Sequence, residues 1–231
     1  MLETVWERLV IPAGLFALAF TGDMRRTNDP ARPGAAANGQ FMLVRRPAYE
    51  RVGGHAAVRA AIIEDTMLAV KIKEAELRFA LLGGAPLIRT RMYRSLPALW
   101  EGLSKNVTET LGGVPITVVA TGLGPLLAWI AVVLPLWLGA AMFGPTSGVP
   151  QEAAFALASL ASLALLGLHM AGARYLAIPM WYGGLFPVGY SLAAFLAASG
   201  LRARRRGRVG WKGRIYRTRR AAPSGHDGPV D

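Results

Sequence analysis

Apolar and polar positions divide the chain into three stretches of different character. Between residues 113 and 200 apolar residues run almost without interruption, whereas the stretches 1–112 and 201–231 mix apolar and charged positions. The apolar stretch contains three segments, at 114–143, 153–173 and 176–199. About 20 apolar residues are enough for a helix to cross the hydrocarbon core of a bilayer. Each segment therefore predicts a transmembrane helix.

In the stretch 1–112 the pattern changes repeatedly. The apolar run at 9–20 is too short to cross a bilayer, and it predicts a helix lying in the interface or packed on the front of the molecule. Farther on, the pattern predicts strands at 40–45, 77–82 and 87–92, and helices at 47–52, from 64 for about three turns, and at 96–110. The last helix is amphipathic and immediately precedes the first apolar segment, so we expect it along the membrane surface. The predicted fold class is a small α/β fragment followed by transmembrane helices.

The distribution of charge supports this three-part organisation. The net charge of +12 is made up of +4 in 1–112, zero in 113–200 and +8 in 201–231, and the middle stretch holds only Glu152 and Arg174. A water-soluble surface cannot be built from 88 residues with two charges. We therefore expect a partial domain at 1–112, transmembrane helices at 113–200 and a basic tail at 201–231, in a multi-pass protein of the inner (plasma) membrane.

The two cationic ends constrain the topology. Cationic flanks stay on the cytoplasmic side, and both the front domain and the tail are cationic. Three full crossings would place them on opposite sides of the membrane. One apolar segment should therefore not cross completely, and the candidate is 176–199, which Pro179, Pro187 and several glycines interrupt. The front domain and the tail are then both cytoplasmic.

Composition removes several classes of chemistry. The absence of cysteine excludes disulfides, thiolate metal sites and a cysteine nucleophile, and His55, His169 and His226 are too far apart in sequence to indicate a metal site. His169 lies inside an apolar segment, where an ionisable group is a functional suspect, but we expect it to reach the headgroups beside Arg174. The tail has cations interleaved with aromatic residues, yet anionic lipid explains this more simply than nucleic acid.

Short motifs occur along the chain in a recognisable order. They are Asn28-Asp-Pro-Ala-Arg-Pro-Gly, Ala37-Asn-Gly-Gln-Phe-Met-Leu-Val-Arg-Arg, Val52-Gly-Gly-His, Ile63-Glu-Asp, Met92-Tyr-Arg-Ser, Leu99-Trp-Glu-Gly-Leu-Ser-Lys-Asn and, in the tail, Trp211-Lys-Gly-Arg-Ile-Tyr. Together they resemble the C-terminal half of a membrane-bound family 2 glycosyltransferase, nearest to the subgroup associated with hopanoid and carotenoid lipids.

The resemblance implies a GT-A fold, a nucleotide-sugar donor, a lipid-like acceptor and a divalent cation, Mg or Mn. The ligands of that cation are not in this chain, because the nucleotide-binding half that precedes these motifs in the family is missing. A truncated reading frame, a separate chain that supplies the missing half, and a degenerate copy all remain open. A non-catalytic membrane scaffold derived from such an enzyme is the alternative function.

The resemblance also implies roles for individual residues. Asp65, next to Glu64, matches the catalytic base of an inverting transfer, although acids at a helix start can simply cap the helix. A second group matches the acceptor pocket and consists of Asn38, Gly39, Gln40 and His55, for which a turn and a surface histidine are the alternatives. On the interfacial helix, Trp100 and Lys105 stand where polysaccharide-forming relatives carry Gln-x-x-Arg-Trp. Lys105 is a candidate to steady the leaving diphosphate, or it is an interfacial lysine that snorkels. The missing motif favours single transfers.

Overall fold

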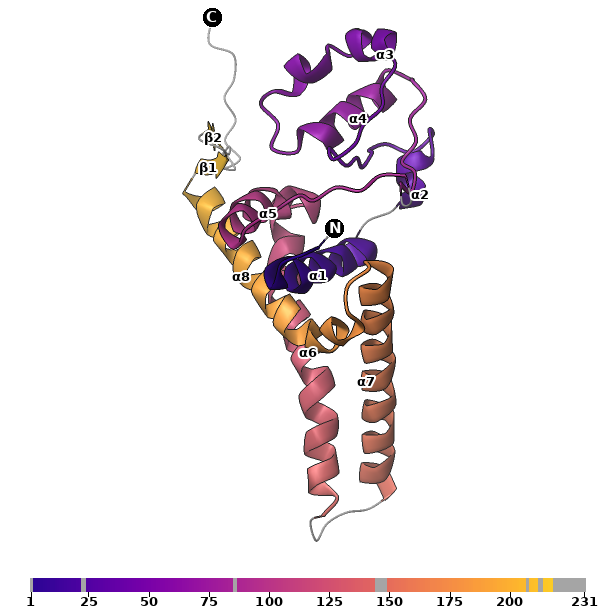
Figure 1. The fold of residues 1–231 in the computed structure, drawn as a ribbon, viewed down its shortest axis with the longest axis vertical. Helices are drawn as coiled ribbons and strands as arrows, with labels where there is room; N and C mark the ends of the chain where they lie inside the picture. Colours follow the sequence, from indigo (N-terminus) through magenta and orange to yellow (C-terminus); the bar gives the residue numbers. More distant parts are fainter. Residues whose placement is uncertain are drawn as a thin grey trace, which may run out of the picture.

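The computed structural model describes residues 2–21, 24–84, 87–143, 149–206, 208–211 and 214–217. Its most extended part is an antiparallel hairpin of α6 (Val114–Ala141) and α7 (Val149–Tyr175), seen at the bottom of Figure 1. A 3-10 turn, η2 (Met180–Leu185), and helix α8 (Phe186–Arg205) follow. Three stretches, Val114–Ala141, Pro150–Tyr175 and Met180–Arg205, are long and apolar enough to cross a membrane. The expectation of a multi-pass membrane protein is confirmed at this level.

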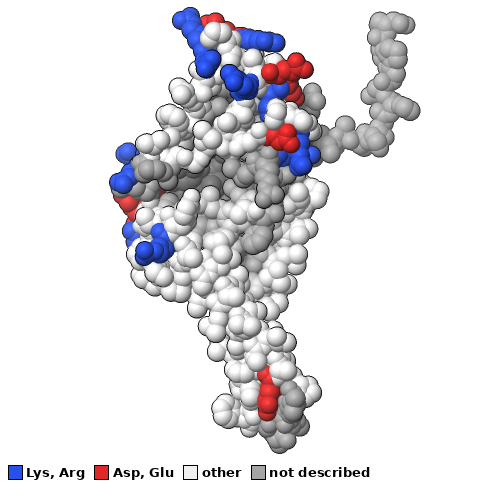
Figure 2. Space-filling view, turned by 90° about the vertical axis from the view of Figure 1, so that its right-hand side faces the viewer, with Lys and Arg blue, Asp and Glu red and all other residues white. Residues whose placement is uncertain are grey.

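Helices α6 and α7 meet through small side chains and internal hydrogen bonds. The Ser162 hydroxyl donates to the Ala131 carbonyl on α6, and the Phe155 ring lies 3.0 Å from where a Cβ would stand on Gly139. In lipid no water satisfies a polar group, so a serine hydroxyl is stable only with a protein partner such as this carbonyl. Figure 2 shows charged side chains gathered around the other end of the molecule and near the hairpin tip, with an uncharged surface between.

Turn η2 and helix α8 are fixed by close glycine contacts at three points, one in η2 and two in α8. A Cβ on Gly183 in η2 would lie 2.6 Å from the Met170 nitrogen of α7, and one on Gly189 would lie 2.6 Å from the Leu9 carbonyl oxygen. Farther along, Gly200 packs directly on the Ser104 carbonyl of α5 (Leu96–Thr110). These contacts place the start of α8 beside the last turns of α7, and its end on the helix that precedes α6. Helix α1 (Val5–Thr21) and the end of α8 thus lie at the same end of the hairpin (Figure 1).

The front of the molecule contains several helices joined by irregular segments. They are α1 (Val5–Thr21), α2 (Met24–Asn28), α3 (Arg46–Arg51), η1 (Gly54–Val58), α4 (Glu64–Glu74) and α5 (Leu96–Thr110). The predicted amphipathic helix at 96–110 is confirmed as α5, with Ser95 as its N-cap. Helix α1 lies across α8 and α5, where Val10, Leu99 and Leu196 form a buried cluster. A separate small core of Val58, Leu68 and Ile72 joins η1 to α4.

The predicted α/β fold class is wrong. In the described part of 2–112 no residue belongs to a strand, so the expected strands at 40–45, 77–82 and 87–92 are irregular segments. The β-structure that is described is a two-stranded antiparallel hairpin of β1 (Arg208–Trp211) and β2 (Arg214–Arg217). An apolar run becomes a strand only when a neighbouring segment completes its hydrogen bonds. At Leu81 a side chain does this instead: the Asn28 amide accepts from the Leu81 N–H at 2.7 Å and donates to its carbonyl at 3.0 Å.

Candidate functional site

The start of α4 joins two of the segments singled out in the sequence. The N-cap position, Ile63, gives no side-chain hydrogen bond, and the acids Glu64 and Asp65 occupy the first turn, where they suit the helix dipole. Asp65 Oδ1 accepts from the Thr66 N–H at 2.8 Å, and Oδ2 accepts from the Gly39 N–H at 2.6 Å. The candidate base and the candidate acceptor loop are therefore in direct contact.

The loop itself is a turn built around Asn38. Its Oδ1 accepts from the Gln40 N–H at 3.1 Å, an arrangement that Asn forms readily in turns. A Cβ on Gly39 would lie 3.1 Å from Asp65 Oδ2, so the backbone approaches the carboxylate closely because this residue has no side chain. The three loop residues are exposed, which leaves the Asp65 carboxylate bordered by a solvent-accessible turn.

Lys105 brings α5 close to the start of α4. The buried face of α5 carries Leu99, Gly102, Lys105 and Thr108 at helical spacing, and the Lys105 side chain is only 4% exposed. Its Nζ lies 4.0 Å from Oε2 of the half-exposed Glu64. The lysine thus turns inward to Glu64, which does not fit the alternative of an interfacial lysine that snorkels outward. We call Gly39, Glu64, Asp65 and Lys105 the acid–lysine cluster.

Two other predicted site residues lie elsewhere. Trp100 packs against the buried cluster that contains Leu99, and it borders an open groove with Glu101, Ser104 and Ser199. His55 is exposed; its Nδ1 lies 2.7 Å from the Tyr49 hydroxyl, whose oxygen accepts from the His55 backbone N–H at 2.9 Å. None of these interactions involves Asp65. The acid–lysine cluster therefore contains only some of the site residues that the sequence predicted.

The divalent cation expected from the resemblance has no site in the described residues. No group of three or more His, Cys, Asp or Glu side chains among them lies close enough to hold a metal ion. Within the acid–lysine cluster the Glu64 carboxylate lies 4.0 Å from a buried ammonium, which is the wrong charge for a cation site. The residues present do not fit Mg²⁺ or Mn²⁺, and no chemical step is assigned to either ion.

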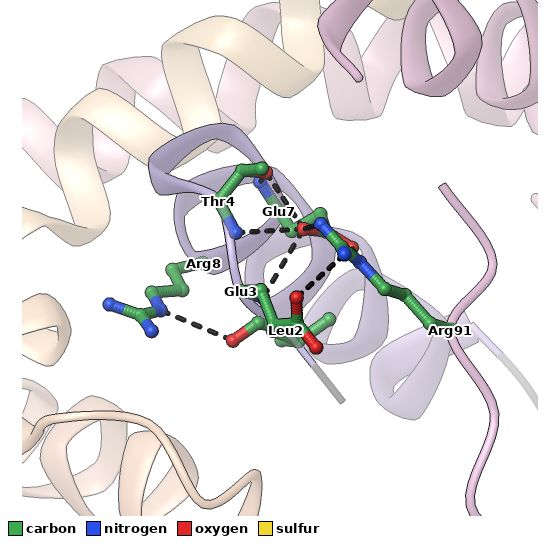
Figure 3. Close-up of polar contacts among 6 residues, drawn as sticks. All are labelled: Leu2, Glu3, Thr4, Glu7, Arg8 and Arg91. Carbon is green, nitrogen blue, oxygen red and sulfur yellow. Dashed lines mark hydrogen bonds and ion pairs between the residues drawn. The ribbon is translucent and has the colours of Figure 1, made fainter. Parts of the chain in front are cut away.

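Sequence reasoning missed a buried charge cluster at the start of α1 (Figure 3). Glu7 is 2% exposed; its Oε2 accepts from the Thr4 N–H at 2.8 Å, and Arg91 Nη2 donates to Oε2 at 3.1 Å. Burial by itself raises the pKa of Glu7, but the Arg91 guanidinium and the Thr4 and Glu3 hydrogen bonds outweigh it and lower the pKa to about 2. The pattern Thr4-Val5-Trp6-Glu7 is a capping-box signature, and it could have revealed the hydrogen bonds between Thr4 and Glu7.

His169 is enclosed by helices and does not reach the headgroups as expected. It is 6% exposed, and its Nδ1 donates to the Leu165 carbonyl at 2.8 Å, while the rings of Phe16 and Phe186 lie 4.5 Å from its own. Its Nε2 lies 3.4 Å from the Tyr190 hydroxyl. A cavity of about 20 Å³ adjoins it, which is room for a single water-sized molecule. His169 therefore joins α1, α7 and α8.

Comparisons with known proteins add no relative. No family model matches the chain, and no curated protein or solved structure shows significant similarity to it. The functional argument therefore depends on the residues and on their geometry.

Proposed function

We propose that this chain is the acceptor-side part of a membrane-bound glycosyltransferase, with Asp65 as its general base. The observation that carries the proposal is the contact between Asp65 Oδ2 and the Gly39 N–H, 26 residues apart in sequence. The ordered motifs assign these two residues to the base and to the acceptor loop. Their contact supports the proposal because it brings together the two residues that match the base and the acceptor loop.

The chemistry follows from the carboxylate. An ionised carboxylate has about four acceptor positions, and the Gly39 and Thr66 N–H groups use two of them. A remaining position can accept the hydrogen bond of an acceptor hydroxyl. As the hydroxyl oxygen forms its bond to the anomeric carbon, the bond from that carbon to the nucleoside diphosphate breaks, and Asp65 takes the hydroxyl proton. Attack from the face opposite the leaving group inverts the configuration.

Lys105 and Glu64 support this site electrostatically. Two adjacent carboxylates repel each other, and a buried ammonium 4.0 Å from Glu64 offsets part of their charge. A cation at this position is also available to the negative charge that develops on the departing diphosphate. In the family that the motifs resemble, a nucleotide-binding half holds the nucleotide-sugar donor, and none of the residues above is assigned to that task. The acceptor we propose is a lipid-like alcohol, because α5 lies at the base of the cluster and directly precedes a membrane helix.

A non-catalytic membrane scaffold is the second candidate, and one observation favours it. Both oxygens of Asp65 accept backbone N–H groups, which is also what a purely structural aspartate does when it joins a loop to a helix start. In that case the cluster would hold the front of the molecule together and would carry out no reaction.

A transfer assay separates the two functions. Membranes containing the full chain are incubated with radiolabelled UDP-sugars, with and without a lysate that can supply a nucleotide-binding partner, and the lipid extract is counted. We expect label in the lipid fraction, and a loss of about 10²- to 10⁴-fold in Asp65→Asn, which retains an acceptor for Gly39 but cannot take up a proton.

The matched control is Glu74→Gln, which removes an exposed carboxylate from the other end of α4. It should leave transfer unchanged. Equal activity in both variants, or no lipid labelling under any condition, would establish the scaffold function. Circular dichroism melting of Asp65→Asn distinguishes lost chemistry from lost folding.

A further inference from the structure

The charges of the α6–α7 hairpin mark how deeply it enters a bilayer. Between residues 113 and 200 only Glu152, in the first turn of α7, and Arg174, in its last turn, are charged. Twenty-two residues of α-helix separate them, which is about 33 Å along the axis. This matches the hydrocarbon thickness of about 30 Å. Helix α7 therefore crosses completely, with one charge at each membrane surface.

If Arg174 marks one membrane surface, η2 and the start of α8 lie inside the membrane. Gly183 packs on the His169 carbonyl carbon and the Met170 backbone, and Phe186 stacks on the His169 ring. His169 precedes Arg174 by five residues, so the start of α8 lies about 8 Å below the surface that Arg174 marks. The chain has thus turned back into the lipid after leaving α7.

The other end of α8 returns to the same surface. Gly200 packs on the Ser104 carbonyl of α5, and Arg204 pairs with Glu109 of α5. Helix α5 directly precedes the start of α6, at the end of the hairpin opposite its tip (Figure 1). Although Met180–Arg205 is long and apolar enough to span a membrane, its two ends are fixed within and above one leaflet.

The outward face of α8 changes character along the same path. Val188, Phe195 and Arg202 are exposed and lie seven residues apart, so they share one face of the helix. Along this face an aliphatic side chain is followed by an aromatic one and then by a cation, the order met when passing from hydrocarbon through the interface to the headgroups. Helix α1 packs against α8, with its Leu9 carbonyl in contact with Gly189.

We propose that η2 and α8, covered by α1, form a wedge that occupies only the leaflet on the side of the front domain. Its partner is that leaflet: acyl chains contact Trp181, Leu185 and Val188, and anionic headgroups contact the cations at the end of α8. The chain then crosses the membrane twice, through α6 and α7. His169, held by Phe16 of α1 and Phe186 of α8, positions the wedge against α7.

The absence of cysteine makes a labelling test direct. Single variants Arg59→Cys in the front, Arg205→Cys at the end of α8 and Gln151→Cys at the hairpin tip are treated, in sealed vesicles of known orientation, with a membrane-impermeant maleimide. We expect Arg59→Cys and Arg205→Cys to react from the same side and Gln151→Cys from the other. Reaction of Arg205→Cys together with Gln151→Cys would show that α8 crosses, and the proposal would be wrong.

Depth measurements test the wedge independently. Nitroxide labels are placed on the exposed positions Leu163→Cys, Val188→Cys and Phe195→Cys. Their relative collision rates with oxygen and a polar nickel complex report depth in phosphatidylcholine–phosphatidylglycerol vesicles. Leu163 stands midway between Glu152 and Arg174 and serves as the bilayer-centre reference. The wedge requires Leu163 to be deepest, Val188 intermediate and Phe195 shallowest. A transmembrane α8 would put Phe195 near its own midpoint, as deep as Leu163 and deeper than Val188, and this order would overturn the proposal.

Discussion

The membrane helices and the front lobe (residues 24–84) are held together by different means. Close backbone approach at glycines holds the membrane helices: Gly183 of η2 packs on the backbone of α7, and Gly189 of α8 packs on the Leu9 carbonyl of α1. The front lobe has a core of three buried side chains, Val58, Leu68 and Ile72, and its loops are tied by polar side chains that reach backbone groups. Lipid cannot drive apolar surfaces together, so its helices depend on close fit. The small lobe buries little apolar surface and depends on specific polar ties.

The two regions should therefore respond to different substitutions. An added methyl group should disturb the membrane helices, and a lost hydrogen bond or charge should disturb the front. The junction between them, where Glu7 of α1 meets Arg91, combines burial with charge and should be the most sensitive position.

The largest effect is expected from Glu7→Gln. The change removes the negative charge that faces the Arg91 guanidinium inside a nearly closed environment, and breaking a buried ion pair typically costs about 3 kcal/mol or more. Chemical denaturation in detergent micelles measures the loss. Glu3→Gln is the matched control, because Glu3 pairs with the same arginine at 2.6 Å but is exposed, and its loss should cost less than about 1 kcal/mol. Equal costs for the two would contradict the importance of burial.

The same pair predicts an acid dependence of stability. Because the pKa of Glu7 falls from 4.5 to about 2 on folding, its contribution is complete above pH 4.5 and is lost as the pH falls toward 2. The loss should be absent from Glu7→Gln. Denaturation of wild type and variant at several pH values between 2 and 6 measures the difference, and parallel curves would show that Glu7 gives no such contribution.

The next largest effect tests the membrane side of the comparison. Gly183→Ala places a methyl group 2.6 Å from the Met170 backbone nitrogen, which cannot move without shifting α7, so a loss of about 2 kcal/mol is expected. Gly167→Ala is the control within α7 itself. A Cβ at Gly167 meets nothing within 4 Å, so this change should be neutral or slightly stabilising. Resistance to unfolding by SDS titration compares the two. Similar behaviour would mean that close backbone approach does not hold these helices.

Hydropathy predicted the membrane region well because one physical term dominates there. The expected segments at 114–143 and 153–173 correspond to α6 and α7, and the amphipathic spacing of 96–110 gave α5 to the residue. Burial or exposure to lipid imposes helix on any long apolar run, whatever its distant contacts. His169 was misplaced because its aromatic neighbours come from α1 and α8, far away in sequence.

In the front the apolar runs were misread as strands because local sequence does not specify a hydrogen-bonding partner. The run at 77–82 has the composition of a strand, but the neighbour at Leu81 is the side chain of Asn28. Of the candidate site, Asp65 and Gly39 were singled out by motif order, and their contact was not predictable from spacing. The inward turn of Lys105 depends on α4 lying above α5, which no local pattern encodes.

A smaller effect is expected from Lys73→Met in the front lobe. The Lys73 ammonium donates to the carbonyls of Arg26, Thr27 and Gly34 at 2.9 to 3.2 Å and so holds the loop that follows α2. Methionine keeps the length of the side chain but not its donors, and a loss of about 1.5 kcal/mol should make residues 26–34 more open to hydrogen exchange. Lys71→Met on the same helix is the control. An unchanged exchange rate of residues 26–34 in Lys73→Met would show that contacts other than those of Lys73 hold this loop.

The smallest effect concerns the side chain that replaces a strand. Asn28→Ala removes both hydrogen bonds to Leu81, whereas Asn28→Asp keeps the acceptor for the Leu81 N–H and loses the donor to its carbonyl. These groups are exposed, so water replaces much of what is lost, and Asn28→Ala should cost about 1 kcal/mol. The Leu81 amide should exchange faster in Asn28→Ala and stay protected in Asn28→Asp. Protection that survives in both variants would show that contacts other than the Asn28 side chain protect the Leu81 amide.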